Sequence, residues 1–180
     1  MDKLIDNQSH IITLDVDEYL FDKLRQISQA GYVVVEINSP DEQLLAAALQ
    51  TFPNLKIGAG NIVNVHQLEA YYLAGAHFIT SPGFIPALAQ TANIYSIQYL
   101  PGVATLSEAM HAMSFECFHV RPYPASLTFC SMLNKSLPSL KLYPAEIECE
   151  EIEHFFNLPS VIAVSIINPE PTQLTSLEPA

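Results

Sequence analysis

The chain has 180 residues, of which 49% are hydrophobic and 14% are charged. This composition differs from that of disordered chains, so we expect a single domain over residues 1–180 with one buried core. Nineteen acidic against seven basic residues leave a formal net charge of −12, which repels phosphate backbones and anionic lipids and argues against nucleic acid or a membrane as a partner.

The sequence carries no signal that predicts export or membrane insertion. No apolar run approaches the roughly 20 residues that span a bilayer, and Met1-Asp2-Lys3 is not followed by the apolar segment of a signal peptide. We therefore expect a cytoplasmic protein. Cys117, Cys130 and Cys149 are an odd number without Cys-x-x-Cys spacing, which predicts small buried side chains and neither a disulfide framework nor a zinc site.

Short β-branched or aromatic runs recur along the chain, and each predicts a β-strand. They begin near Ile11, Tyr32, Leu55, His77, Tyr95, Cys117, Leu140 and Val161. Successive runs lie 18 to 23 residues apart, and the segments between them have helical periodicity, as Leu20, Leu24 and Ile27 illustrate. The chain is therefore predicted to alternate strand and helix.

Helix-start signals support this alternation. Ser39-Pro40-Asp41-Glu42 predicts a helix with Ser39 as its N-cap, a first-turn proline and a reciprocal glutamate, and Thr105-Leu106-Ser107-Glu108 predicts a second capping box. The strand candidates are mostly continuous apolar runs, such as Tyr32-Val33-Val34-Val35. Such runs are typical of parallel strands that are covered by helices.

Eight strand and helix units predict a compact (β/α)8 TIM barrel of parallel strands, whereas five or six units would fit an open doubly wound sheet. About 22 residues per unit leave no room for a lid, because such barrels usually have about 250 residues. Pro169, Pro171 and Pro179 predict an extended tail over residues 168–180, in place of the helix that normally follows the eighth strand. The C-terminus is thus shortened, and closure of the last unit is an open question.

Chemistry in such a barrel belongs at the C-terminal ends of the strands. Motifs stand at the ends of the second to fifth predicted strands: Val35-Glu36-Ile37, Ile57-Gly58-Ala59-Gly60-Asn61, Ala74–Gly83 and Leu100–Thr105. In this order and spacing the sequence resembles the 2-keto-3-deoxy-6-phosphogluconate/4-hydroxy-2-oxoglutarate (KDPG/KHG) aldolase family. The resemblance implies a (β/α)8 barrel, a homotrimer, and a lyase that releases pyruvate through a lysine Schiff base, without a metal or other cofactor.

The resemblance assigns roles to particular positions. Glu36 matches the glutamate that shuttles protons, and Asn61 stands where the family has a threonine that contacts the pyruvate portion. The family's arginine shortly after the glutamate is absent, because Asn38-Ser39-Pro40-Asp41 contains no cation. The positions expected to contact substrate are Gly60, Asn61, Ser81, Pro82, Gly83, Pro101 and Arg121.

The later strands depart from the family pattern. The sixth strand should contain Phe-Lys-Phe-Phe-Pro, and here it is Phe118-His119-Val120-Arg121-Pro122, so His119 stands where the Schiff-base lysine is expected. Imidazole cannot form the iminium that this chemistry needs. Tyr143-Pro144-Ala145-Glu146-Ile147 places a carboxylate where the family has a Gly-Gly phosphate nest, and Ser165-Ile166-Ile167-Asn168 lacks the second glycine pair. A phosphorylated substrate is therefore disfavoured.

Two explanations remain open for the charged residues of this region. Strand alternation puts His119 and Arg121 on one face, so Arg121 could anchor a carboxylate while Glu36 and His119 exchange protons in the keto–enol chemistry of a 2-oxo acid. Alternatively, Arg121 forms an internal salt bridge with Glu36 or Glu146. Lys56 or Lys141 could be a relocated Schiff-base lysine, or merely a solvated or snorkelling side chain.

A divalent metal is a further hypothesis, with Glu36, His119 and Asp15 or Asp17 as ligands. Their spacing is not diagnostic, and Asp15 and Asp17 also suit a strand end and a helix N-cap, so we expect no metal. The acidic run Glu146–Glu153 is predicted to be a solvated segment that starts a helix, with a docking surface for a basic partner as the alternative.

The sequence thus leaves distinct functional hypotheses. The first is an aldolase-like barrel with lost or altered activity on a small non-phosphorylated 2-oxo acid. The second is a pseudoenzyme, a catalytically inactive homologue that acts as a binding or assembly subunit. The third is a barrel that binds an unrelated metabolite.

Overall fold

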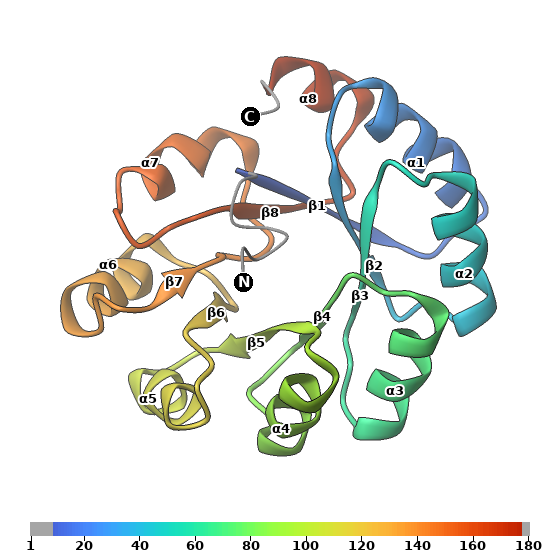
Figure 1. The fold of residues 1–180 in the computed structure, drawn as a ribbon. Coiled ribbons are helices and arrows are strands. Elements are labelled where there is room, and N and C mark those ends of the chain that lie inside the picture. Colours follow the sequence, from blue (N-terminus) through green and yellow to red (C-terminus); the bar gives the residue numbers. More distant parts are fainter. Residues whose placement is uncertain (1–8, 178–180) are drawn as a thin grey trace.

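The computed structural model describes residues 9–177, in which eight parallel strands alternate with helices around a ring (Figure 1). The strands are β1 (His10–Asp15), β2 (Val34–Asn38), β3 (Lys56–Gly60), β4 (Phe78–Ser81), β5 (Gln98–Val103), β6 (His119–Pro122), β7 (Lys141–Leu142) and β8 (Val164–Ile167). The helices are α1 (Leu20–Gln29), α2 (Glu42–Thr51), α3 (Val65–Ala74), α4 (Pro86–Tyr95), α5 (Leu106–Ser114), α6 (Leu127–Ser136), α7 (Ile152–Phe156) and α8 (Pro171–Ser176), and a 3₁₀ turn (Cys149–Glu151) precedes α7.

The strands form a closed barrel, as the spacing of the strand candidates predicts. The sheet runs β7-β6-β5-β4-β3-β2-β1-β8, and every paired neighbour is parallel. The two ends of this order meet through backbone hydrogen bonds: the Leu142 N–H donates to the Ser160 carbonyl at 2.7 Å and the Ser165 N–H donates to the Pro144 carbonyl at 2.8 Å. The last unit therefore closes the ring.

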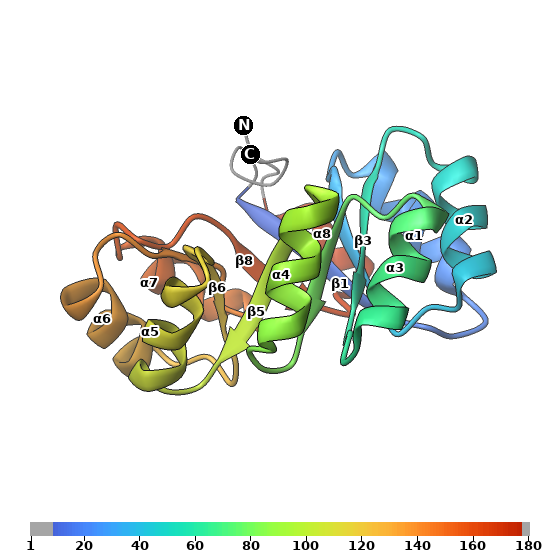
Figure 2. The same cartoon turned by 60° about the horizontal axis from the view of Figure 1, so that its bottom comes forward.

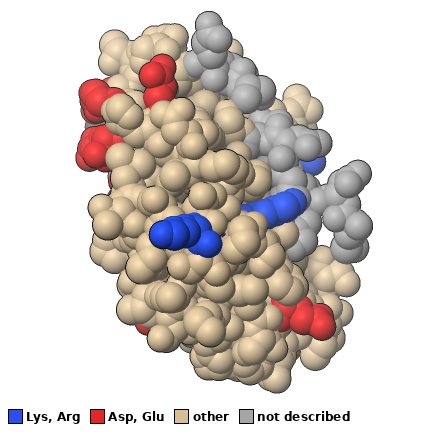
Figure 3. All heavy atoms as spheres, turned by 90° about the vertical axis from the view of Figure 1, so that its left-hand side faces the viewer, with Lys and Arg blue, Asp and Glu red and all other residues tan. Residues whose placement is uncertain are grey.

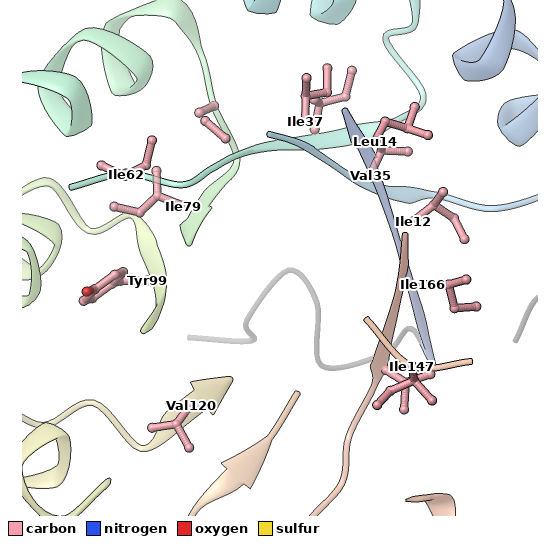
Figure 4. Close-up of a cluster of buried hydrophobic side chains, with 14 of the residues drawn as sticks. Ile12, Leu14, Val35, Ile37, Ile62, Ile79, Tyr99, Val120, Ile147 and Ile166 are labelled. Carbon is pink, nitrogen blue, oxygen red and sulfur yellow. The ribbon is translucent and has the colours of Figure 1, made fainter. Parts of the chain in front are cut away.

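Side chains alternate between the two faces of each strand and form separate clusters. The outer cluster packs between strands and helices and includes Ile12, Val35, Ile79 and Val120 (Figure 4), and the helices stand on the outside of the strands (Figure 2). The inner cluster fills the barrel with a single layer of apolar side chains: Ile11, Val34, Phe78, Leu100, Tyr143 and Ala163. This layer divides the barrel interior into an upper part, at the C-terminal ends of the strands, and a lower part, at their N-terminal ends.

The predicted capping box at Thr105 is present, with Thr105 and Glu108 bonding each other's backbone N–H groups. The prediction of Ser39 as an N-cap is wrong. The cap of α2 is Asp41, whose carboxylate accepts a hydrogen bond from the Leu44 N–H at 2.7 Å. Ser39 lies instead in the turn that ends β2, with φ of 45°, because its N–H donates to the Gly60 carbonyl at 3.0 Å.

The extended tail expected over 168–180 is also wrong for its described part, since α8 occupies Pro171–Ser176. Pro171 is compatible with a helix because it stands in the first turn, where its missing N–H would have no intrahelical acceptor. Glu170 and Gln173 form a reciprocal cap around it. Residues 178–180 of the tail, including Pro179, lie outside the described residues.

The three cysteines differ in burial: Cys130 is buried, and Cys117 and Cys149 are half-buried. Burial raises the pKa of the Cys130 thiol to about 12, which makes it unreactive as a nucleophile. Within residues 9–177, no helix combines the length and the apolar character that crossing a membrane would require.

Candidate functional site

A buried carboxylate occupies the upper part of the barrel. Glu36 projects from β2 two residues after Val34 of the inner cluster, and only 1% of its surface is exposed. The Arg121 Nη1 donates to Glu36 Oε1 at 2.6 Å and to Oε2 at 2.5 Å. The Thr80 hydroxyl donates to Oε1 at 2.8 Å, and the Thr13 hydroxyl lies 3.5 Å from Oε2. A charge taken out of water needs such partners, and Glu36 has them.

Arg121 comes from β6, on the other side of the barrel, and is 7% exposed. Its Nη2 lies 3.4 Å from the Ser165 hydroxyl of β8, which shares a 2.7 Å hydrogen bond with Thr13 of β1. Within residues 9–177 no hydrogen bond engages the Arg121 Nε. Because guanidinium carries five N–H donors, Arg121 can serve Glu36 and still offer donors to an anion.

Gly60 makes room for the carboxylate at the end of β3. A Cβ at this position would lie 2.5 Å from Glu36 Oε1 and 2.5 Å from Asn38 Oδ1. At the rim, Asp15 accepts hydrogen bonds from the Asn38 amide at 2.9 Å and from the Asn168 amide at 2.8 Å. The rim of the barrel is thus tied together across β1, β2 and β8.

A cavity of about 20 Å³ lies beside the ion pair, which is space for about one water molecule. Its lining residues are Asn38, Asn61, Thr80, Ser81, Pro82, Arg121, Tyr123 and Glu146. Left-handed backbone conformations of residues other than glycine surround this mouth, at Ser39 (φ 45°), Asn61 (φ 60°), Glu146 (φ 57°) and Asn168 (φ 42°). Such conformations are costly and cluster at functional sites.

His119 does not lie with Glu36, although its position in the resemblance suggests that it should. It is two residues before Arg121 on the same strand face, and its ring stacks on that of Tyr143 of the inner cluster, with centroids 5.8 Å apart. The side chain that meets Glu36 is Arg121. The alternative of an internal salt bridge between Arg121 and Glu36 therefore describes the observed geometry.

Lys56 and Lys141 are the first residues of β3 and β7. Because all strands are parallel, both residues stand at the N-terminal end of the barrel, opposite the end that holds the Glu36 carboxylate. Another lysine, Lys3, lies outside the described residues. The described geometry thus places Arg121, and neither of these lysines, against Glu36.

The other predicted contact residues lie around the mouth in different ways. Asn61, Ser81 and Pro82 line the cavity. The Ser81 hydroxyl bonds the Tyr99 hydroxyl at 2.6 Å and the Gly83 carbonyl at 2.6 Å, so it holds the turn after β4. Pro101 pairs with Ser81 in the sheet and alternates with the inner-cluster residue before it, which directs it away from the barrel interior.

The metal hypothesis is not supported by the geometry. Asp15 ends β1 as expected and accepts hydrogen bonds from two asparagines. Asp17 accepts hydrogen bonds from Lys23 and from the Tyr19 N–H, but the prediction that it is a helix N-cap is wrong, because the N-cap of α1 is Tyr19. In the described part of the chain, no group of three or more His, Cys, Asp or Glu side chains could hold a metal ion.

Sequence reasoning missed the hydroxyl groups of the site, Thr13, Thr80 and Ser165. The signal for the hydroxyl residues was strand alternation. Each lies two residues after an apolar residue that faces into the barrel, but only the register between strands brings them to one level.

Comparisons with known proteins identify the family that the sequence motifs resemble. Residues 9–169 match the family described as "Aldolase: KDPG and KHG aldolase". The 2-dehydro-3-deoxy-phosphogluconate aldolase of Treponema pallidum is 32% identical over 85 residues, 47% of this chain and 40% of that protein. The KHG/KDPG aldolase of Escherichia coli K12 is 28% identical over 118 residues, 64% of this chain and 55% of that protein. The chain thus spans about half the length of the curated relatives it matches.

Solved structures agree over nearly the whole chain. A 4-hydroxy-2-oxoglutarate/2-dehydro-3-deoxyphosphogluconate aldolase from TTHB1 superimposes with a TM-score of 0.83 at 26% identity, covering 98% of this chain and 94% of that one. The KDPG aldolase of Legionella pneumophila, captured with pyruvate as a covalent carbinolamine, gives a TM-score of 0.86 at 23% identity, covering 97% and 96%. By its match over residues 9–169, this chain belongs to the KDPG and KHG aldolase family.

Proposed function

We propose that this family member does not form a Schiff base, and that it binds a small 2-oxo acid non-covalently with Arg121 as the carboxylate anchor. The observation that carries the proposal is the ion pair between Arg121 and Glu36. A guanidinium stands against the glutamate that, by resemblance, shuttles protons. Guanidinium stays protonated and is not a carbonyl nucleophile, so covalent capture of a ketone is unavailable at this position.

The family motif Lys-Phe-Phe-Pro can be placed on this strand in two registers, because both Pro122 and Pro124 can match its proline. The first register puts His119 at the lysine. The second, Arg121-Pro122-Tyr123-Pro124, puts Arg121 there. The contact of Arg121 with Glu36 supports the second register, in which a permanently charged guanidinium replaces the reactive amine.

The remaining groups suit acid–base chemistry on a bound oxo acid. A ligand carboxylate can accept hydrogen bonds from the Arg121 donors that Glu36 leaves available. Glu36 would then exchange a proton with the carbon next to the ketone, which gives keto–enol exchange without cleavage of a carbon–carbon bond. Entry of the ligand requires side chains at the mouth to move, since the cavity holds only about 20 Å³.

Deuterium exchange at the methyl group of pyruvate tests this function. The protein in heavy water should exchange the methyl protons faster than buffer does, and Glu36→Gln should remove the excess rate while Glu148→Gln keeps it, because Glu148 is exposed and lies outside the cavity lining. Circular dichroism of each variant verifies that it is folded. An exchange rate equal to that of buffer for the unaltered protein would contradict proton transfer by Glu36.

The small cavity also favours a second candidate, a catalytically inactive subunit. In that case the ion pair fills a former active site that no longer admits a substrate. The protein then acts through its surface in a homotrimer or another assembly. Figure 3 shows a broad uncharged surface that is interrupted by basic side chains and bordered by acidic ones, and Met132 on α6 and Phe156 on α7 are exposed. Light scattering after gel filtration measures the assembly: a trimer together with the absence of pyruvate binding and exchange would favour this candidate.

A further inference from the structure

The rim carboxylate of Glu146 offers a way to discriminate between ligands of the proposed site. Glu146 lines the same cavity as Arg121 and Tyr123, and it is exposed. Within residues 9–177 its carboxylate forms no hydrogen bond or ion pair. The mouth thus presents a guanidinium at its floor and an uncompensated negative charge at its edge.

The backbone holds Glu146 firmly in this place. The Ala145 N–H donates to the Pro122 carbonyl at 3.1 Å, and the Ile147 N–H donates to the Ser165 carbonyl at 2.8 Å. Both neighbours of Glu146 are therefore fixed to β6 and β8, and both are buried. With φ of 57°, Glu146 bulges out between them, in a conformation that residues with a Cβ rarely adopt.

We infer that Glu146 selects the class of 2-oxo acid, favouring a ligand whose far end is an uncharged hydrogen-bond donor and rejecting one whose far end is phosphorylated or otherwise anionic. This inference rests on the proposed function. With its carboxylate on Arg121, a ligand places its far end toward the rim, where a hydroxyl group can donate to Glu146 and a phosphoryl or phosphonyl group meets a like charge.

Calorimetric titration with matched ligands tests the inference. Pyruvate has no polar tail, 3-hydroxypyruvate carries a hydroxyl group on the same carbon, and phosphonopyruvate carries an anionic group there. The unaltered protein should bind 3-hydroxypyruvate more tightly than phosphonopyruvate. Glu146→Gln should raise the affinity for phosphonopyruvate by about fivefold at low ionic strength, with little change for pyruvate, and added salt should shrink the difference.

Glu148→Gln is the matched control, because it removes the same charge from the same segment outside the cavity lining. If the ratio of phosphonopyruvate to pyruvate affinity is the same in the unaltered protein and in Glu146→Gln, or changes equally in both variants, the inference is overturned while the proposed function stands. If no protein binds pyruvate, the proposed function is overturned and the inference fails with it.

Discussion

At the scale of single residues, the buried pair of Arg121 and Glu36 is the central feature of the candidate site. Both side chains are almost fully buried, so each depends on the other for its charge to be tolerated. The hydroxyl groups of Thr80 and Thr13 satisfy further lone pairs of the carboxylate. The residues are thus strongly coupled, and their substitutions are not expected to have additive effects.

Replacing one partner of this pair should destabilise the fold far more than replacing both. We expect Arg121→Met or Glu36→Gln alone to lower the free energy of unfolding by about 3–5 kcal/mol. The first variant leaves the buried Glu36 carboxylate without its cation, and the second leaves the buried Arg121 guanidinium without its anion. The double variant should recover most of this loss. Urea unfolding measures the cycle, and Arg25→Met, which breaks the exposed pair with Asp22, serves as a control with little effect. Additive losses would show that the two charges are not coupled.

His77 should make stability depend on pH. Burial lowers the pKa of His77 below its ordinary value of 6.5, although hydrogen bonding with the Ile57 backbone opposes this shift and the charge of Lys56 adds to it. The Nδ1 of His77 accepts a hydrogen bond from the Ile57 N–H at 3.1 Å. Below about pH 6.5, His77 therefore binds a proton more readily in the unfolded chain than in the folded chain. The free energy of unfolding consequently falls as the pH falls.

Urea midpoints at pH 7.5 and 5.5, values chosen to bracket the ordinary histidine pKa, measure this effect. His77→Asn keeps an acceptor for the Ile57 N–H and should reduce the loss at the lower pH. His66→Asn, an exposed control, should leave the loss unchanged. Some dependence should persist in His77→Asn, because burial also lowers the pKa of His10. Equal losses in His77→Asn and the unaltered protein would contradict the role given to His77.

The sequence predicted the charged residues of the site but not their arrangement. Glu36 could be found from its motif, and alternation along one strand predicted that Arg121 shares a face with His119. Which of the two meets Glu36 could not be predicted, because two prolines allow two registers of the same motif. The hydroxyl groups of Thr13, Thr80 and Ser165 were not predicted as part of the site, because only the register between strands brings them to one level.

At the scale of elements, six residues in or beside the strands form the apolar layer, and the polar residues of the site follow two residues later along β1, β2, β4 and β8. This alternation places the site directly on a packed support, and the end of β3 must leave space for the carboxylate. Local signals predicted these elements well where a cap is self-contained, as at Thr105. They failed at Ser39, where a hydrogen bond from another strand decides the conformation, and at α8, where a proline was compatible with a helix start.

Gly60 provides a test at this scale. In Gly60→Ala the new methyl group would lie 2.5 Å from Glu36 Oε1 and Asn38 Oδ1, so both side chains must shift, and we expect a loss of about 1–3 kcal/mol in the free energy of unfolding. Gly83→Ala is the matched control, because a Cβ there meets nothing within 4 Å, and its effect should stay within about 0.5 kcal/mol. A Gly60→Ala protein as stable as Gly83→Ala would mean that the space beside Glu36 is not restricted.

At the scale of the whole molecule, parallel strands in a closed ring separate two chemically different ends. The C-terminal ends of the strands hold the ion pair and the cavity, and the N-terminal ends hold Lys56 and Lys141. The regular spacing of apolar runs sufficed to predict this architecture, since the repeated unit leaves few other ways to bury a parallel sheet. Closure between β7 and β8 was not predictable from the short last unit and depends on backbone pairing.

Arg121 is proposed to occupy the place of the imine-forming amine. Borohydride reduction in the presence of pyruvate, followed by peptide mass spectrometry, tests it on the unaltered protein, on Arg121→Lys and on His119→Lys. We predict no adduct on any lysine of the unaltered protein, an adduct on the new side chain of Arg121→Lys, which lies beside Glu36, and none in His119→Lys, whose new side chain would lie at the level of Tyr143. An adduct on a native lysine such as Lys56 or Lys141, or an adduct in His119→Lys but not in folded Arg121→Lys, would contradict the claim.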